Sequence, residues 1–485
     1  MYFSSCIFYI FMREFAKTKI VATIGPSSWD KTILKDMIFN GMDVARINAS
    51  FADFAELERV SKDIKELSSR VAIMLDTQGH KIRTTGFTNE IVLKNNDKVA
   101  IIPQNRIKKN ETDNIHIRIT YDTLHEDVSR SATILLDDGN IVLTVEDIKD
   151  DEVICTVEEG GVLKPKKTVN IPNSHLRFPV LSEKDTEDIK FAVKNEFDFI
   201  SASFIRNVQD VAQVRKVMGQ TNVKLIAKIE NREGLDNFDQ ILPLVDGVMI
   251  ARGDMGVEIP LQEVPIFQKQ LIYKCRVVGK PVIVATQMLE SMTENIRPTR
   301  AEVSDVANAI MDGCDAVMLS AETSTGRYPV ECVKMMNSIA LSVENVLRPQ
   351  KVDGDTNASI ETDELCKSVF DLVNTIPIKG VIVISLSGKT VQSLSRHRLM
   401  VPIWEIGKEI KRVRQNSLLR GVKGFYINDL PEDRDSAVKQ SVQCVYSYGE
   451  LDLEDKIAII SGSSIKNRSI NSILEIANVK DILGS

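Results

Sequence analysis

Eight short runs of β-branched and other apolar residues, alternating with helix-like segments, constrain the fold of this chain more than any other feature. Near-continuous apolar runs are typical of strands buried on both faces, and strand–helix alternation favours parallel pairing. Eight such units predict an α/β fold built on a closed (β/α)8 TIM barrel. The predicted strands span residues 19–26, 43–50, 71–77, 197–205, 223–230, 245–254, 280–289 and 314–323.

One gap between these runs is far too long for a single crossover helix. It separates the third and fourth predicted strands and contains alternating strand-like segments at 115–119 and 134–145. The second of these contains Asp138-Gly139, a dipeptide that favours a tight hairpin. We therefore expect an inserted small β-barrel lid domain at 80–172, which divides the barrel domain into 17–79 and 173–347.

The chain continues well beyond the eighth strand. Residues 348–362 are polar, contain Pro and Gly, and are interpreted as a linker. Residues 363–485 again alternate helices and strands, which predicts a C-terminal open α/β domain. Its strands are expected at 380–386, 401–406, 424–427 and 455–461.

The first sixteen residues are interpreted as an extension outside the fold. The apolar stretch from Met1 to Met12 is too short to span a bilayer and has no basic region before it. We favour translation from Met12 over translation from Met1.

Composition narrows the function classes. The 485 residues carry 61 Lys and Arg against 68 Asp and Glu, a net charge of -7, without the basic excess that nucleic-acid binding usually requires. Seven scattered cysteines with no C-x-x-C pair indicate reduced thiols and a cytoplasmic protein. No run of 18 apolar residues after the N-terminus indicates a membrane span. We expect partners that are neither nucleic acid nor membrane.

Reactive residues of such a barrel collect at the carboxyl ends of its strands. On the second predicted strand, Arg46, Asn48 and Ser50 alternate along the chain, so they share one side. A guanidinium suits a phosphate, and neutral oxygens suit a hard cation. A hydrogen-bond network at the sheet end is the alternative explanation.

The fifth and sixth predicted strands supply a second group. Lys228 and Glu230 share one face, and Asp254 follows the neighbouring strand, so Glu230 and Asp254 are expected side by side at the barrel mouth. Two carboxylates there can hold Mg²⁺, with Lys228 near the anion that the metal binds. A buried Lys228–Glu230 ion pair is the alternative. Gly253 allows a ligand carboxylate to approach backbone amides closely.

Other strand ends complete a polar pocket with two arginines, a lysine and a metal site, which is the equipment for phosphoryl transfer. A basic turn in the lid, 160–167, could lie over this pocket, although a solvated turn is the simpler interpretation. The dispersed histidines argue against a histidine-based nucleophile. The polar residues at these other strand ends are Asp76, Thr77, Arg83, Ser203, Thr286, Gln287, Ser320 and Glu322.

At these residues the chain resembles the pyruvate kinase family. The segment VKLIAKIENREGL at 223–235 is similar to the family's active-site signature around its Lys and Glu. Further similar blocks follow in the family's order, including KTKIVATIGPSS, VARINAS, MLDTQGHKIRT, ARGDMGVEIP, KPVIVATQMLESM and LSAET. The resemblance runs from about Lys17 to the end. It implies the same three-domain fold and phosphoryl transfer from phosphoenolpyruvate to ADP in glycolysis.

The resemblance also implies roles for individual residues. Arg46 and Lys228 would stabilise the transferring phosphoryl group, and Glu230 and Asp254 would bind Mg²⁺ or Mn²⁺. Thr286 would lie on the side from which the enolate carbon is protonated. The substrate carboxylate would contact Gly253, Asp254 and Thr286. The nucleotide phosphates or the transferring group would contact Arg83, Lys167, Asn48 and Ser320.

The family's monovalent-cation site would fall on Asn48, Ser50, Asp76 and Thr77. Lys81 stands where K⁺-dependent members carry an acidic residue, so its ammonium is expected to replace a bound K⁺ and make K⁺ dispensable.

The C-terminal domain carries a loop that resembles the family's effector-phosphate loop, formed by Ser385, Ser387, Gly388, Lys389 and Thr390. Its amides and hydroxyls would form an anion nest for a sugar-phosphate or nucleotide effector. A plain strand–helix turn is the alternative. The last loop, 461–468, lacks the Gly-Thr-Thr-Asn pattern often found in the family, which leaves the effector open.

Two other functions are alternatives to phosphoryl transfer. One is a Mg²⁺-dependent carbon–carbon lyase on a related barrel, and the other is a catalytically inactive sugar-phosphate sensor. Arg46, the lid and the third domain argue against the lyase. The intact set Arg46, Lys228, Glu230, Asp254 and Thr286 argues against the sensor. The family also suggests a homotetramer.

Overall fold

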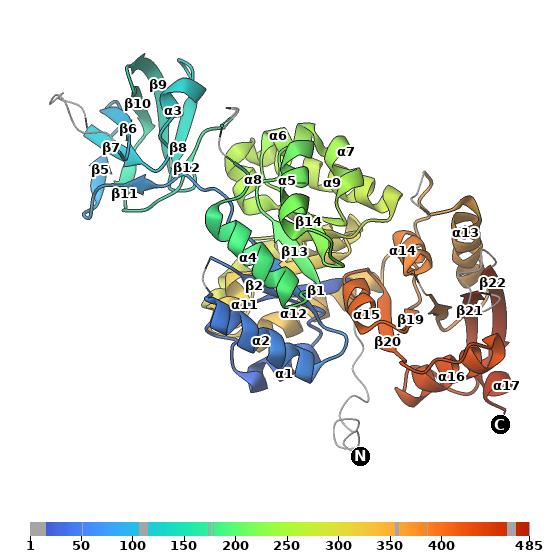
Figure 1. Cartoon of the computed structure of the whole chain (residues 1–485). Helices are drawn as coiled ribbons and strands as arrows, with labels where there is room; N and C mark the ends of the chain where they lie inside the picture. The colour runs from blue at the N-terminus through green and yellow to red at the C-terminus, as the bar shows by residue number, and fades with distance from the viewer. Residues whose placement is uncertain are drawn as a thin grey trace.

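The computed structural model describes residues 16–50, 52–105, 115–172, 174, 176–177, 179–354, 358–385, 387–462 and 472–484. These form three parts: a central barrel, a β domain on one side of it and an α/β domain on another (Figure 1). The expected extension before Ala16 and most of the last C-terminal loop, from residue 463, lie outside the described residues. Within the described part of the chain, no helix combines the length and apolarity needed to cross a membrane.

The central part is a closed parallel barrel of eight strands, as the sequence predicted. The strands follow one another around the barrel in the order β1-β17-β16-β15-β14-β13-β3-β2. Each lies within one of the eight predicted runs. They are β1 (Lys19–Ile24), β2 (Val44–Asn48), β3 (Ala72–Asp76), β13 (Phe199–Ala202), β14 (Lys224–Ile229), β15 (Gly247–Ala251), β16 (Val282–Ala285) and β17 (Ala316–Leu319).

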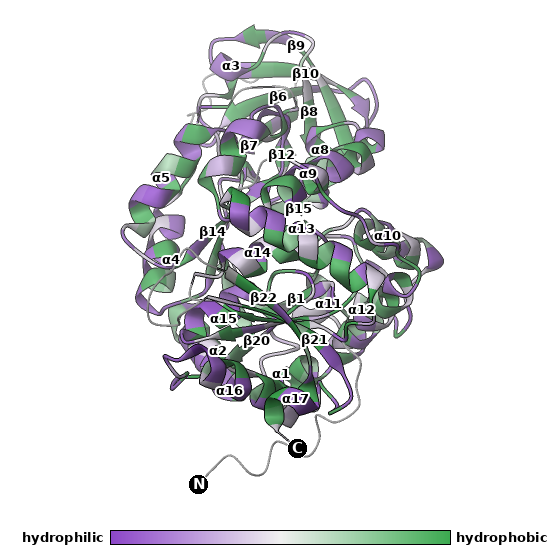
Figure 2. Ribbon diagram, turned by 90° about the vertical axis from the view of Figure 1, so that its right-hand side faces the viewer, coloured by the Kyte–Doolittle hydropathy of each residue, from purple (hydrophilic) through white to green (hydrophobic). Residues whose placement is uncertain are grey.

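Helices surround the barrel, so its strands are covered outside and packed inside. Figure 2 shows hydrophilic and hydrophobic colours alternating along these helices, which fits elements with one apolar face. Capping boxes start α4 at Ser182 and α10 at Thr299. The barrel helices are α1 (Lys31–Phe39), α2 (Phe54–Leu67), α4 (Glu183–Lys194), α5 (Val208–Met218), α6 (Arg232–Asp236), α7 (Phe238–Ile241), α8 (Arg252–Glu258), α9 (Val264–Val278), α10 (Arg300–Met311), α11 (Ala321–Ser324) and α12 (Pro329–Glu344).

The inserted domain is a β structure with its own apolar core. Its main sheet has the order β12-β8-β9-β10-β6-β7-β4, and β11 pairs with β5 in a small second sheet. A bridge between Arg83 and Thr168 joins the two edges of the main sheet, so the sheet curls back on itself. The elements are β4 (Thr84–Thr85), β5 (Ile91–Leu93), β6 (Lys98–Pro103), β7 (Ile115–Ile119), α3 (Leu124–Asp127), β8 (Thr133–Leu136), β9 (Ile141–Lys149), β10 (Glu152–Glu159), β11 (Gly161–Leu163) and β12 (Val169–Asn170).

The predicted hairpin of this domain is confirmed. Strands β8 and β9 pair antiparallel across a turn in which Asp137, Asp138 and Gly139 all have positive φ. Gly139 adopts such a backbone without strain, and aspartate tolerates it better than most residues.

The C-terminal domain has a five-stranded sheet in the order β20-β19-β18-β21-β22. Four strands are parallel and match the predicted ones, whereas β22 pairs antiparallel with β21 and was not predicted. The elements are α13 (Ile360–Thr375), β18 (Val381–Ile384), α14 (Lys389–Arg396), β19 (Ile403–Gly407), α15 (Ile410–Asn416), β20 (Val422–Tyr426), α16 (Arg434–Ser447), β21 (Lys456–Gly462), β22 (Ser472–Asn478) and α17 (Val479–Leu483). Short 3₁₀ turns at Leu242–Leu244, Leu261–Glu263 and Glu290–Thr293 complete the chain.

The C-terminal domain closes the amino-terminal end of the barrel. Leu418, in the connection from α15 to β20, is fully buried in the cluster of residues that fills the barrel interior. Arginines beside it pair with acids that precede barrel strands: Arg398 with Asp315, and Arg414 with Asp198. The barrel interior is therefore sealed at this end by Leu418, and the opposite end, at the carboxyl termini of the strands, is where the sequence places the reactive residues.

Candidate active site

A chain of buried charges crosses the carboxyl end of the barrel. Arg46, near the end of β2, donates from Nε to Asp76 Oδ2 at 2.6 Å. Asp76 Oδ1 lies 3.3 Å from Lys228 Nζ, which lies 3.0 Å from Glu230 Oε1. Lys228 also donates to Ser203 Oγ at 2.7 Å. Residues from four different strand ends thus meet, as predicted, and the suspected Lys228–Glu230 pair forms only one part of this chain.

These contacts keep the side chains of Asp76 and Lys228 charged. Burial would raise the pKa of Asp76, but Arg46 and Lys228 outweigh it, and the net pKa is lowered. Burial likewise opposes the charge on Lys228, but the carboxylates of Asp76 and Glu230 raise its pKa above the usual range. The site therefore presents a guanidinium and an ammonium held by one buried carboxylate.

Glu230, the residue after β14, is completely buried. Its Oε2 accepts a hydrogen bond from the Phe204 backbone N–H at 2.7 Å, while its Oε1 has the Lys228 ammonium at 3.0 Å and no hydrogen bond from any other described residue. Burial raises its pKa, Lys228 opposes this, and Asp254 raises it further. A carboxylate oxygen that contacts only a cation among the described residues, beside a second acid, is suited to bind a metal ion.

Asp254 lies in the first turn of α8 rather than at the end of β15 itself. Its Oδ1 is 2.6 Å from Lys81 Nζ, and both side chains are about one-quarter exposed. Glu230 and Asp254 fit a hard divalent ion, since Mg²⁺ needs only one or two carboxylates when substrate oxygens and water complete its coordination. Among the described residues, no group of three or more His, Cys, Asp and Glu could hold a metal.

Thr286 follows β16 in a strained backbone, with φ of 69°. Its Oγ1 accepts from the Gly253 N–H at 2.8 Å and donates to the Ala285 carbonyl at 2.6 Å. Arg252, which sequence reasoning missed, fixes this turn by donating to the Thr286 carbonyl at 2.8 Å and pairing with Asp305. A positive φ in a non-glycine residue at such a site is a functional indicator.

The residues predicted for a monovalent cation lie on one side of the mouth. Asn48 Oδ1 accepts from the Ser50 N–H at 2.9 Å, and Thr77 Oγ1 accepts from the Ser203 N–H at 3.1 Å. Asp76 is already engaged by Arg46 and Lys228. Lys81, which was predicted to replace K⁺ here, forms its ion pair with Asp254.

The residues predicted to contact nucleotide are held within their own domains. Arg83 donates to the Lys166 carbonyl at 3.0 Å, and Lys167 Nζ is 2.6 Å from Asp137 Oδ1. The buried Oγ of Ser320 has no hydrogen-bond partner in the described structure, and its N–H donates to Glu322 Oε2 at 2.6 Å. The side chains of Arg83 and Lys167 are thus held by residues of the lid, Lys166 and Asp137.

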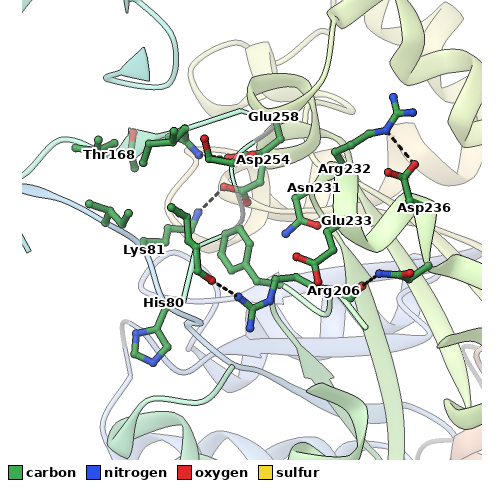
Figure 3. Close-up of a pocket in the computed structure, with 18 residues that line it drawn as sticks. His80, Lys81, Thr168, Arg206, Asn231, Arg232, Glu233, Asp236, Asp254 and Glu258 are labelled. Atoms are coloured by element: carbon green, nitrogen blue, oxygen red, sulfur yellow. Dashed lines mark hydrogen bonds and ion pairs between the residues drawn. The ribbon is translucent and has the colours of Figure 1, made fainter. Parts of the chain in front are cut away.

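A cavity of about 440 Å³ opens beside Asp254, between the lid and the barrel (Figure 3). A hydrogen bond connects the domains along it, from Asn170 Nδ2 to Glu258 Oε1 at 2.8 Å. Arg206 donates to the carbonyl of Leu176, in the segment by which the chain returns from the lid to the barrel, at 3.2 Å. Asn170, Glu258 and Arg206 carried no distinguishing sequence signal, because such contacts arise only when the two domains meet.

The predicted effector loop precedes α14. Gly388, with φ of 75°, donates its N–H to Ser385 Oγ at 2.9 Å, and the Lys389 N–H lies 3.4 Å from Ser387 Oγ. Thr390 lies in the first turn of α14. A side chain at Gly388 would meet Asn416 and Arg412. This arrangement fits both an anion nest and a plain strand–helix turn.

Comparison with known proteins assigns the chain to a family. The model of the pyruvate kinase barrel domain matches residues 15–333, and that of the pyruvate kinase alpha/beta domain matches residues 363–476. The chain belongs to the pyruvate kinase family. The resemblance seen in the sequence motifs is therefore confirmed, as are the TIM barrel and the C-terminal α/β domain.

Individual pyruvate kinases match over almost the whole chain. That of Geobacillus stearothermophilus is 41% identical over 484 residues, covering 96% of this chain and 81% of the relative. Those of Clostridium perfringens and Clostridium acetobutylicum are 41% and 39% identical, covering 87% and 96% of this chain and 92% and 100% of theirs. These matches favour neither the lyase nor the sensor.

Proposed function

We propose that this chain transfers the phosphoryl group of phosphoenolpyruvate to ADP, giving ATP and pyruvate as in glycolysis. The observation that carries the proposal is the pair of cations, Arg46 and Lys228, held at the barrel mouth by the buried carboxylate of Asp76. Phosphoryl transfer develops charge on the phosphoryl oxygens, and preorganised cations stabilise that charge. Membership of the pyruvate kinase family supports the assignment of substrates.

Glu230 and Asp254 would hold Mg²⁺ or Mn²⁺ at the site. The ion would neutralise charge on the substrate oxygens and orient them. In support, Glu230 Oε1 has no hydrogen bond from any described residue other than Lys228, and Asp254 binds an ammonium. Lys228 lies within 3.0 Å of Glu230, so the transferring group and the metal carboxylates would be neighbours.

The substrate carboxylate would contact Gly253, Asp254 and Thr286. The bond from phosphorus to the enol oxygen breaks as an oxygen of the ADP β-phosphate bonds to phosphorus, and the enolate carbon then takes a proton. Thr286 would orient this proton transfer, because Arg252 fixes its backbone while its hydroxyl remains near the Gly253 amide. Asn48, Arg83, Lys167 and Ser320 would contact the nucleotide phosphates after the lid moves.

Four further properties belong to the proposal. Ser385, Ser387, Gly388, Lys389 and Thr390 would bind a phosphate-bearing effector, supported by the left-handed backbone of Gly388 before α14. The chain would act in the cytoplasm, and the domain boundaries would be those given by the sequence. It would assemble as a homotetramer, since the edge strand β22 exposes Ile473 and Ile476, and α9 exposes Ile266 and Tyr273.

The test is a coupled assay of pyruvate formation from phosphoenolpyruvate. We expect turnover that requires both ADP and a divalent ion and is lost in Asp254→Asn. Asp239→Asn, an exposed acid on α7, serves as the control and should keep full activity. A folded wild-type protein that forms no pyruvate with Mg²⁺ and ADP present would contradict the proposal.

A further inference from the structure

Lys81 has a position that the proposed chemistry does not explain. It lies on the segment that leaves the barrel after β3 and enters the lid at β4. Its ammonium is 2.6 Å from Asp254 Oδ1, one of the two acids proposed to hold the divalent ion. The carboxylate thus already has a cationic partner supplied by the protein.

This ammonium also acts on the other proposed metal ligand. Glu230 is compensated mainly by Lys228, which lies 3.0 Å from its Oε1, and Lys81 adds a smaller favourable interaction with the same carboxylate. Lys81 is therefore the direct partner of Asp254 and a secondary one of Glu230. Two cations placed between the same two carboxylates repel each other strongly. The Lys81 ammonium and a divalent ion therefore cannot both lie between Glu230 and Asp254.

The surroundings allow the ammonium to leave. Lys81 and Asp254 both line the cavity of about 440 Å³, and their side chains are 28% and 27% exposed. The Lys81 ammonium also lies 5.6 Å from the centre of the Phe204 ring, a distance at which an aromatic face attracts a cation. Figure 3 shows Lys81 extending toward Asp254 within this cavity. In its pair with Asp254 the ammonium is thus already open to solvent and next to an aromatic face.

We propose that Lys81 is the resident counter-ion of Asp254, and that a divalent ion entering through the cavity must displace it to bind. This inference rests on the proposed metal site. Lys81 thus competes with the divalent ion for Asp254 and weakens the binding of that ion to the enzyme without substrates. The ammonium keeps the acidic pair compensated until a divalent ion arrives.

The test measures Mn²⁺ binding to the full-length protein without substrates, from the electron paramagnetic resonance signal of free Mn²⁺. Lys81→Met should bind Mn²⁺ about fivefold more tightly or better. Mn²⁺ then no longer has to break the Lys81–Asp254 ion pair, and the repulsion between the ammonium and the metal ion is gone. Lys81→Arg keeps the charge and should bind Mn²⁺ like the wild type. Lys149→Met removes an exposed lid lysine and is the matched control, with no expected change.

Unchanged or weaker Mn²⁺ binding in a folded Lys81→Met variant would overturn the inference and leave the proposed function intact. Asp254→Asn separates the two conclusions, since it should weaken Mn²⁺ binding strongly. Mn²⁺ binding that is insensitive to Asp254→Asn would instead contradict the metal site itself, and with it this inference.

Discussion

The two ends of the barrel both bury charged residues but use them differently. At the amino-terminal end, Asp315 accepts from Arg398 through both carboxylate oxygens, at 3.0 and 2.7 Å, and from the N–H groups of Arg420 and Val282. At the carboxyl end, Asp76 Oδ1 and Glu230 Oε1 share the Lys228 ammonium, at 3.3 and 3.0 Å, and have no hydrogen bond from any other described residue. Satisfied charges hold two domains together, whereas incompletely satisfied charges beside a cavity are available to a ligand.

Of the changes predicted here, breaking an ion pair at the sealed end should have the largest effect. That effect should be on the stability of the fold. Asp315→Asn leaves Arg398 buried without a carboxylate, so we expect a loss of roughly 3–5 kcal/mol in the free energy of unfolding. Urea denaturation measures it, with the exposed Asp435→Asn as a control that should change stability by less than about 1 kcal/mol. A change in Asp315→Asn as small as in the control would show that the two ends do not differ in this way.

At the open end, Arg46→Met should reduce activity, while the buried Asp76 keeps its ion pair with Lys228. It removes one of the two cations near the transferring group, and we expect kcat to fall roughly 10²–10³-fold. Arg59→Met, on the surface of α2, is the matched control and should keep wild-type activity. Steady-state kinetics of pyruvate formation measure the effect. A loss below tenfold would remove Arg46 from the proposed catalytic set.

A third buried acid, in the C-terminal domain, is only partly hydrogen-bonded and has no cation paired with it among the described residues. Glu405 on β19 is completely buried, its Oε1 accepts from Asn416, and its Oε2 has no hydrogen-bond partner in the described structure. Burial raises its pKa from 4.5 to about 8. Because the folded pKa is raised, its contribution to stability is present below pH 4.5 and is lost as the pH rises through 8.

Glu405→Gln should therefore flatten this pH dependence. Between pH 6 and pH 8 the wild type should lose roughly 2 kcal/mol more than the variant, at about 1.4 kcal/mol per pKa unit. Urea denaturation at several pH values measures the difference, and the exposed Glu454→Gln should follow the wild type. Parallel pH curves for wild type and Glu405→Gln would mean that Glu405 is ionised throughout this range.

The smallest expected effect is that of K⁺ at the open end. If the Lys81 ammonium substitutes for a monovalent cation, adding K⁺ at saturating ADP should change kcat/KM by less than about twofold. Replacing Na⁺ with K⁺ at constant ionic strength in the coupled assay measures this. A large stimulation by K⁺ would remove this role from Lys81.

Sequence reasoning found the barrel because every strand carries its own local pattern of buried apolar residues. It found Arg46, Lys228, Glu230, Asp254 and Thr286 because each lies in the carboxyl half of a predicted strand or shortly after it, where the barrel places reactive groups. These predictions depend on short segments of chain. The structure brings Arg46, Lys228 and Glu230 together through Asp76, as that reasoning required.

What sequence reasoning missed depends on contacts between distant segments. Nothing local indicates that Leu418 enters the barrel, that Arg414 pairs with Asp198, or that Lys81 meets Asp254. Strand β22 was missed because its short alternating pattern follows a segment that was interpreted as a loop. Such features follow from how the three domains pack, and a single sequence contains no spacing that reveals them.

The central claim is that the charges at the open end of the barrel perform phosphoryl transfer. Its most direct test measures pyruvate formation and urea denaturation on one Lys228→Met preparation. The account predicts a folded protein whose kcat is reduced roughly 10³-fold or more, because the ammonium between Asp76 and Glu230 is gone. A folded Lys228→Met protein that forms pyruvate at a rate near that of the wild type would contradict the account.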